Sequence, residues 1–157
     1  MIRKADAPAA VAELALLLWP DHTLEELTQE FAELIARDDA ACFLAYDGEI
    51  AVGFAQCQLR RDYVEGTVSS PVGYLEGIYV REDHRHRGYA RLLLTACEIW
   101  AKSQGCEEFA SDCEWDNSDS LKFHLSVGFL KSSLYLPSTK TSKYFTTSLS
   151  FKSLSNE

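Results

Sequence analysis

The segment from Gly73 to Ala90 constrains this chain more than any other. Its first half is mostly apolar, which is typical of a buried strand. Its second half is basic, contains Gly88 and leads directly into a periodic apolar run that predicts a helix up to about Ser103. The first amides of a helix lack intrahelical acceptors, and the helix dipole adds positive potential there. Because Gly88 and the small Ala90 permit close backbone approach, the segment favours binding of a pyrophosphate group.

Length and composition indicate one domain, spanning residues 1–157. The chain is 46% hydrophobic, which is enough for a sizeable core. No apolar run reaches the roughly 18 residues of a membrane span, and the start resembles no signal sequence. Its five cysteines are scattered and form no Cys-x-x-Cys pair, which favours reduced thiols over disulfides or zinc ligands. We therefore expect a cytoplasmic protein with no membrane partner.

The net charge of −9 is distributed unevenly. The four lysines and one glutamate after Gly128 give +3, so the residues up to Gly128 carry −12. An acidic body repels nucleic acid and attracts cations. A solvated acidic surface is the ordinary explanation, and a polycationic substrate is the more specific one.

Local signals predict the element order β-α-α-β-β-β-α-β-α-β-β. Pro8 is typical of a helix start, Thr23 with Glu26 forms a capping-box pattern, and Asp47-Gly48 is typical of a hairpin turn. The expected strands are 2–5, 41–46, 50–59, 74–80, 107–112, 134–136 and 144–151, and the expected helices are 9–19, 24–35, 88–103 and about 116–127. The last two strands are expected to pair as a hairpin.

The loop Arg85-x-x-Gly88-x-Ala90, between this strand and this helix, resembles the acetyl-CoA-binding loop of the GNAT acyltransferase superfamily. The element order matches that superfamily as well. The resemblance implies an α/β (α+β) fold: a mixed, twisted central sheet of about seven strands, flanked by about four helices and splayed at its central strand. It also implies acetyl-CoA as co-substrate, with no metal. The residues expected to contact acetyl-CoA are Ile78, Tyr79, Val80, Arg85, His86, Arg87, Gly88, Tyr89, Ala90, Arg91 and Asn117.

Acetyl transfer to an amine needs a group that orients and deprotonates the nitrogen, because an alkylamine with a pKa of roughly 8–10 is mostly protonated at pH 7. Glu76 is the candidate on the central strand, where alternation places it on one face with Ile78. Gly77 permits a bulge or close approach of the cofactor. The alternative is that Glu76 is a paired surface carboxylate.

A second group of carboxylates follows the next strand. Asp112 ends that strand, and Glu114, Asp116 and Asp119 come soon after, which suits an amine-binding wall. The spacing fits no EF-hand loop and no His/Cys set converges, so we expect no metal. Asp116 or Asn117 alternatively caps the following helix.

His124 occupies the position at which many GNAT enzymes have a tyrosine that acts as general acid. A histidine could protonate a leaving thiolate, although a single helical histidine is more often structural. Cys113 lies close to the same region, but no base is evident for it, and an inert buried thiol is the simpler interpretation.

Four further motifs, Leu18–His22, Arg61–Gly66, Ser70–Val80 and Ala110–Asp112, resemble those of aminoglycoside 6'-N-acetyltransferases. The resemblance covers about residues 1–129. It implies N-acetylation of the 6'-amino group of aminoglycoside antibiotics, conferring resistance, by direct transfer in a ternary complex. The residues expected to bind the aminoglycoside are Trp19, His22, Tyr63, Glu76 and Asp112, and those expected to act in catalysis are Glu76, Asp112 and His124.

The C-terminal segment, residues 130–157, departs from that family. Its similar members carry a Glu-rich segment after Gly-Phe, whereas this chain has a basic Ser/Thr-rich run. Strands at a sheet edge must be covered or paired, so we expect a homodimer that uses residues after Phe129, with a folded-back monomer as the alternative. Two other functions stay open: a GNAT enzyme for another cationic amine (a polyamine or protein N-terminus), and a non-catalytic CoA- or aminoglycoside-binding protein.

Overall fold

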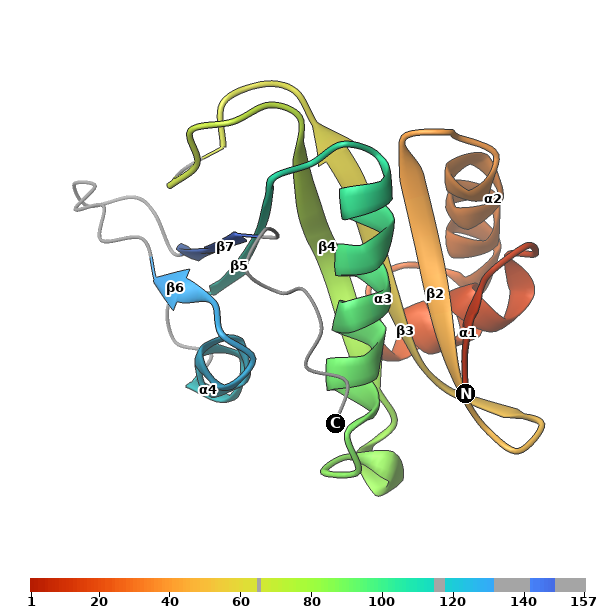
Figure 1. The fold of residues 1–157 in the computed structure, drawn as a ribbon. Coiled ribbons are helices and arrows are strands. Elements are labelled where there is room, and N and C mark those ends of the chain that lie inside the picture. Colours follow the sequence, from red (N-terminus) through yellow and green to blue (C-terminus); the bar gives the residue numbers. More distant parts are fainter. Residues whose placement is uncertain (65, 115–117, 132–141, 149–157) are drawn as a thin grey trace. The chain divides into compact units, whose positions relative to one another are not determined.

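The computed structural model describes residues 1–64, 66–114, 118–131 and 142–148. The chain divides into two compact units. Unit 1 comprises Met1–Gln58 and Leu75–Trp100, and unit 2 comprises Leu59–Tyr74 and Ala101–Glu157. Figure 1 traces the elements of both along the chain.

Unit 1 is a sheet with helices on both faces. The strands lie in the order β1 (Ile2–Lys4), β2 (Ala40–Asp47), β3 (Ile50–Arg60) and β4 (Val72–Val80), with β3 ending and β4 beginning in unit 2. The β1–β2 and β2–β3 pairs are antiparallel. The helices are α1 (Ala9–Leu18), α2 (Leu24–Ile35) and α3 (Tyr89–Ser103), with a short 3₁₀ turn, η1 (Glu82–His84), before α3.

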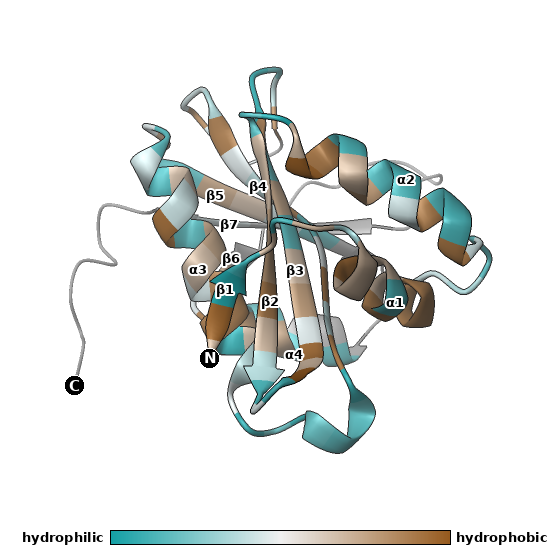
Figure 2. Cartoon of the chain, turned by 90° about the vertical axis from the view of Figure 1, so that its right-hand side faces the viewer, coloured by the Kyte–Doolittle hydropathy of each residue, from teal (hydrophilic) through white to brown (hydrophobic). Residues whose placement is uncertain are grey.

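The main core of unit 1 lies between the sheet and the two N-terminal helices. Leu44 and Phe54, which are opposite each other on β2 and β3, pack in one apolar cluster with Val11, Leu14 and Leu27 of α1 and α2. Figure 2 shows the apolar residues along these strands and α1. On the opposite face, a Cβ added at Gly53 would lie 3.3 Å from Leu93 Cδ1 of α3. Helices α1 and α2 therefore pack on one face of this sheet and α3 on the other.

The helix starts agree with their sequence signals. At α2 the Glu26 N–H donates to Thr23 Oγ1 (3.1 Å), and the Thr23 N–H donates to Glu26 Oε2 (3.0 Å), so the predicted capping box is confirmed. Helix α1 follows Pro8 as expected and ends at Leu18, one residue early. The β2–β3 hairpin is confirmed, but Asp47 pairs with Ile50 and the loop residues are Gly48 and Glu49. The turn thus lies one residue later than Asp47-Gly48 suggests, with Gly48 at a φ of +61°.

Unit 2 contains the start of β4, then β5 (Glu108–Glu114), α4 (Ser118–Ser126), β6 (Leu130–Lys131) and β7 (Ser142–Ser148). The last three strands lie in the order β5-β7-β6, and both pairs are antiparallel. The predicted strand at 144–151 is described as β7 up to Ser148, and its described partners are β5 and β6. The predicted strand at 134–136 and the end of the other, 149–151, lie outside the described residues.

Over the described residues, the chain has seven strands and four α-helices, which confirms the expected mixed fold. In the part of the chain that the structure describes, no helix combines the length and apolar character needed to cross a membrane.

Candidate active site

A cavity of about 300 Å³ opens in unit 1 beside the corner between α1 and α2. Its lining combines an aromatic and aliphatic wall with two carboxylates, an amide and an imidazole. The lining residues are Trp19, His22, Leu27, Glu30, Phe31, Leu34, Gln56 and Glu76. The structure therefore brings together Trp19, His22 and Glu76, which the sequence predicts for the acceptor site. Glu30 and Gln56 also line the cavity and were not predicted from the sequence.

The Glu76 carboxylate is held by a neighbouring strand. The side-chain amide of Gln58 on β3 donates from Nε2 to Glu76 Oε1 over 2.7 Å. Because the amide is neutral, this bond fixes the carboxylate without cancelling its charge. Gln58 was also missed by the sequence analysis, since cross-strand partners follow from register rather than from local pattern.

Trp19 packs directly over the backbone of β4. A Cβ added at Gly77 would lie 2.8 Å from Trp19 Cη2 and 2.9 Å from Trp19 Cζ2. Glu76 lines the same cavity as Trp19. Glu76 and Gly77, although consecutive, therefore both face the side of β4 on which Trp19 lies. The strict alternation expected to place Glu76 and Ile78 on one face is therefore broken, as at a β-bulge. Trp19 is itself supported by the buried Phe54, whose ring is edge-on to it at a centroid distance of 6.0 Å.

The predicted cofactor turn connects the end of β4 to α3 within unit 1. His86 and Gly88 have positive φ angles of 63° and 87°, a left-handed backbone conformation that is common in anion-binding turns. A Cβ added at Gly88 would meet nothing within 4 Å, so the turn is open there. Arg85 Nε donates to the Val80 carbonyl over 2.9 Å, and this bond ties the turn to the strand end. Strand residues 78–80 and turn residues 85–91 thus belong to one local structure, which fits a pyrophosphate group. Asn117 lies outside the described residues.

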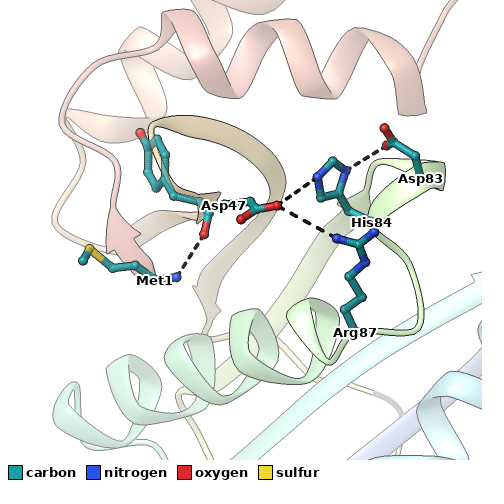
Figure 3. Close-up of polar contacts among 6 residues, drawn as sticks. Met1, Asp47, Asp83, His84 and Arg87 are labelled. Atoms are coloured by element: carbon teal, nitrogen blue, oxygen red, sulfur yellow. Dashed lines mark hydrogen bonds and ion pairs between the residues drawn. The ribbon is translucent and has the colours of Figure 1, made fainter.

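The β2–β3 hairpin contacts this turn through ion pairs (Figure 3). Asp47 Oδ2 lies 3.3 Å from His84 Nε2 and 3.9 Å from a guanidinium nitrogen of Arg87. His84 Nδ1 in turn lies 2.8 Å from Asp83 Oδ1. The hydrogen bond from His84 lowers the pKa of Asp83. The hairpin and the turn are about forty residues apart in sequence, and no local pattern predicted their contact.

In unit 2, the loop that carries Tyr63 is anchored to β5. The Glu108 carboxylate accepts the backbone N–H groups of Val68 (2.9 Å) and Ser69 (2.8 Å) and the Ser69 hydroxyl. Val64 is buried, whereas Tyr63 is 78% exposed. Asp112 lies on β5 and is exposed. Tyr63 and Asp112 thus belong to unit 2, with their side chains accessible to solvent.

His124 is buried in unit 2, with 2% of its surface exposed. Its Nε2 lies 2.9 Å from Ser111 Oγ of β5, and the Phe129 ring packs against it at 5.3 Å. This environment favours the structural interpretation of His124, because its described polar contact is used to hold the residue before Asp112. The side chains of Cys113 and Glu114, and all of Asp116, lie outside the described part of the chain.

Cys42, Cys57, Cys97 and Cys106 are buried, and within the described part of the chain they form no disulfide. Burial raises the pKa of Cys42 to about 12 and raises that of Cys97 as well. The thiols of Cys42 and Cys97 are therefore uncharged and unreactive near neutral pH. Among the residues that the structure places, no three His, Cys, Asp or Glu side chains are arranged to hold a metal ion.

The element order, the open positive-φ turn before α3 and the carboxylate on β4 together define an acetyltransferase of the GNAT type. A model of the acetyltransferase (GNAT) family matches residues 10–129, and the chain belongs to that family.

Similar proteins within this family include aminoglycoside acetyltransferases. The chain is 48% identical over 127 residues to the aminoglycoside N(6')-acetyltransferase type 1 of Stenotrophomonas maltophilia, covering 80% of each protein. It is 44% identical over 117 residues to the Acinetobacter haemolyticus enzyme of the same name, covering 74% of this chain and 80% of that relative.

Solved structures agree with these relatives. The aminoglycoside acetyltransferase AAC(6')-Iy, in complex with a bisubstrate analogue of CoA and acetylneamine, matches with a TM-score of 0.83 and 35% identity. That match covers 89% of this chain and 97% of the other. AAC(6')-Ih from Acinetobacter baumannii matches with a TM-score of 0.80 and 37% identity over the same shares of the two chains.

Proposed function

We propose that this chain is an acetyl-CoA-dependent aminoglycoside 6'-N-acetyltransferase that confers antibiotic resistance, and that residues 1–157 act as one acetyltransferase domain. The observation that carries this proposal is the Glu76 carboxylate, fixed by Gln58 in a cavity walled by Trp19. An anionic cavity with an aromatic wall suits an amino sugar. The relatives that act on aminoglycosides support the substrate class.

The turn before α3 is suited to bind the pyrophosphate of acetyl-CoA. Its backbone amides, the start of α3 and the side chains of Arg87 and Arg91 supply the positive potential that phosphates require. The open space beside Gly88 leaves room for a phosphate against the backbone. When bound, acetyl-CoA supplies the acetyl group as a thioester. A related structure with CoA bound, that of AAC(6')-Iy, supports this assignment.

The transfer itself needs few protein groups. Glu76 binds the 6'-ammonium, accepts one proton from it and orients the neutral nitrogen. The nitrogen then attacks the thioester carbonyl carbon, forming the C–N bond while the C–S bond breaks, and the second proton passes to the leaving thiolate. We assign stabilisation of the developing oxyanion to backbone N–H groups of residues 78–80, a contribution of about 3–4 kcal/mol for one such donor.

The remaining predicted residues receive supporting roles. We assign His22 to the acceptor pocket, whose lining it shares with Trp19. Tyr63 and Asp112 are assigned to the acceptor as well, Asp112 as a second carboxylate for its ammonium groups, and Asn117 to the pantetheine or phosphate end of acetyl-CoA. For His124 we propose a positioning role through Ser111, because it is buried and already hydrogen-bonded.

The decisive experiment is an initial-rate assay of purified protein with acetyl-CoA and kanamycin A, following release of free CoA thiol. We expect turnover and a product acetylated at the 6'-amine. Spermidine and a peptide N-terminus serve as comparison acceptors. Absence of turnover with every 6'-amino aminoglycoside, or faster turnover with spermidine or the peptide, would refute the proposal.

We further propose that the protein is a homodimer in the cytoplasm, where acetyl-CoA is available. The short strand β6 is the last in the sheet order, and an edge of this kind is open to pairing with a second chain. Light scattering of the full-length chain and of one truncated after Leu130 tests the assembly. A monodisperse full-length monomer at micromolar concentration would contradict the homodimer.

A further inference from the structure

Glu30 is a carboxylate on the face of α2 that lines the cavity. It lies three residues after Leu27 and four before Leu34, and with Phe31 these residues form one helical stripe. All four line the cavity, although Leu27, Phe31 and Leu34 are buried apolar side chains and Glu30 is charged and exposed. A charged residue in an otherwise apolar stripe is unexpected if the stripe serves packing alone.

The other glutamates of α2 differ from Glu30 in position or partner. Glu26 completes the capping box with Thr23, and Glu33 accepts a hydrogen bond from Gln29 (3.4 Å). Glu25 lies in the first turn, outside the cavity lining. Within the described part of the chain, the Glu30 carboxylate has neither a hydrogen bond nor an ion pair. Its charge is therefore available to a ligand.

The charge balance of the cavity makes that ligand cationic. The lining supplied by the described residues contains Glu30 and Glu76 but no lysine or arginine. Arg37, whose charge interacts with Glu76, is bound through two nitrogens to Asp39 at 2.8 and 3.1 Å. Arg37 therefore already has a carboxylate partner, and the charge of Glu30 is left to a ligand.

We infer that Glu30 is a specificity-determining residue that binds a second ammonium group of the acceptor while Glu76 binds the one to be acetylated. This inference rests on the proposed function and deepens it. The substrate class it implies is an amino sugar with at least two ammonium groups that together span one cavity of about 300 Å³. The aromatic wall of Trp19 and Phe31 lies in the same cavity and suits the sugar ring.

The test compares Glu30→Gln with Glu33→Gln, a matched control that removes one charge from the same helix outside the cavity lining. Both are assayed against kanamycin A and against acetyl-CoA, with Glu30→Asp as the variant that keeps the charge. For Glu30→Gln we expect the acceptor KM to rise up to about fivefold, the upper end of the range for an exposed charge pair, while the acetyl-CoA KM stays unchanged. Glu33→Gln should change neither, and Glu30→Asp should recover part of the loss.

Titration calorimetry with neamine, without acetyl-CoA, separates this inference from the proposed function. If the wild type turns over but Glu30→Gln and Glu33→Gln behave alike, the inference about Glu30 is wrong and the function stands. If the wild type shows no turnover, the proposed function fails. In that case equal neamine affinity for the two variants overturns the inference as well, and weaker binding by Glu30→Gln alone supports it.

Discussion

At the scale of single residues, Glu76 presents a carboxylate with one oxygen already hydrogen-bonded to Gln58. Glu76→Gln removes the charge that we propose to pair with the acceptor's ammonium group. We expect kcat/KM for the acceptor to fall roughly 10- to 100-fold, the cost of one charge-assisted hydrogen bond. Gln58→Leu should have a smaller effect in the same direction, because the charge stays but its orientation is lost. Initial rates with both substrates varied check this, and an equal rise in acetyl-CoA KM would contradict it.

Gly77 permits the contact between Trp19 and the strand. Gly77→Ala places a methyl group 2.8 Å from the indole, so either the ring or β4 must move, at a cost of about 1–3 kcal/mol in unfolding free energy. We expect a higher acceptor KM and a lower Tm. The double variant with Trp19→Ala provides the control, because Gly77→Ala should cost less once the ring is gone. Additive effects of the two changes would show that the contact is not the cause.

At the scale of elements, the β2–β3 hairpin contacts the turn before α3 through Asp47. Asp47→Asn keeps the shape but removes the ion pairs with His84 and Arg87. Because exposed pairs of this kind contribute about 0.2–1 kcal/mol, we expect a two- to fivefold rise in acetyl-CoA KM with the acceptor KM unchanged. Asp38→Asn, an exposed change of equal charge before β2, is the matched control. An unchanged acetyl-CoA KM in Asp47→Asn would mean that the hairpin does not position the turn.

Glu108 on β5 anchors the loop that carries Tyr63 through hydrogen bonds. Three donors from Val68 and Ser69 converge on one carboxylate oxygen. Glu108→Gln weakens these bonds and should lower the unfolding free energy by about 1–3 kcal/mol. Hydrogen exchange at Val68 and Ser69 should accelerate, whereas the adjacent exposed change Glu107→Gln should leave it unaltered. Unchanged exchange in Glu108→Gln would show that the loop is held by its own bonds, such as that from the Thr67 hydroxyl to the Val64 carbonyl.

The elements that the sequence predicts well are those with local causes. The capping box at Thr23 and Glu26, the turn at Gly48 and the helix after Gly88 each depend on a few adjacent residues. The features that it misses depend on partners distant in sequence. Gln58 reaches Glu76 through strand register, Asp47 reaches His84 through the placement of a hairpin, and the break in alternation at Gly77 depends on Trp19.

The residues of the candidate site likewise fall into those that local motifs predict and those that only the tertiary structure shows. Trp19, His22 and Glu76 could be predicted because they lie in motifs that resemble a known family, and they do line one cavity. Glu30 could have been found from its place in an apolar helical stripe, but on a surface helix a glutamate is usually solvated. Its significance depends on the cavity, which only the tertiary structure shows.

At the scale of the whole molecule, the net charge produces an electrostatic field that reaches beyond individual contacts. The net charge of −9 arises from an acidic body and a basic C-terminal segment. The basic groups that we propose to bind phosphate lie in one turn, whereas Glu30 and Glu76 line the cavity proposed for the acceptor. Two substrates of opposite charge are therefore expected to respond differently to ionic strength.

The salt dependence of the two kinetic constants tests this expectation. Raising NaCl from about 20 to 300 mM shortens the Debye length from roughly 20 to 6 Å, which weakens the attraction of an acidic body for a polycation. We expect kcat/KM for kanamycin A to fall several-fold, because long-range attraction raises the encounter rate. For acetyl-CoA, a polyanion approaching an acidic protein, the same salt screens repulsion as well as the attraction of the turn, so its KM should change little. An acceptor kcat/KM that is insensitive to salt would show that binding depends on contacts inside the cavity rather than on the field of the whole chain.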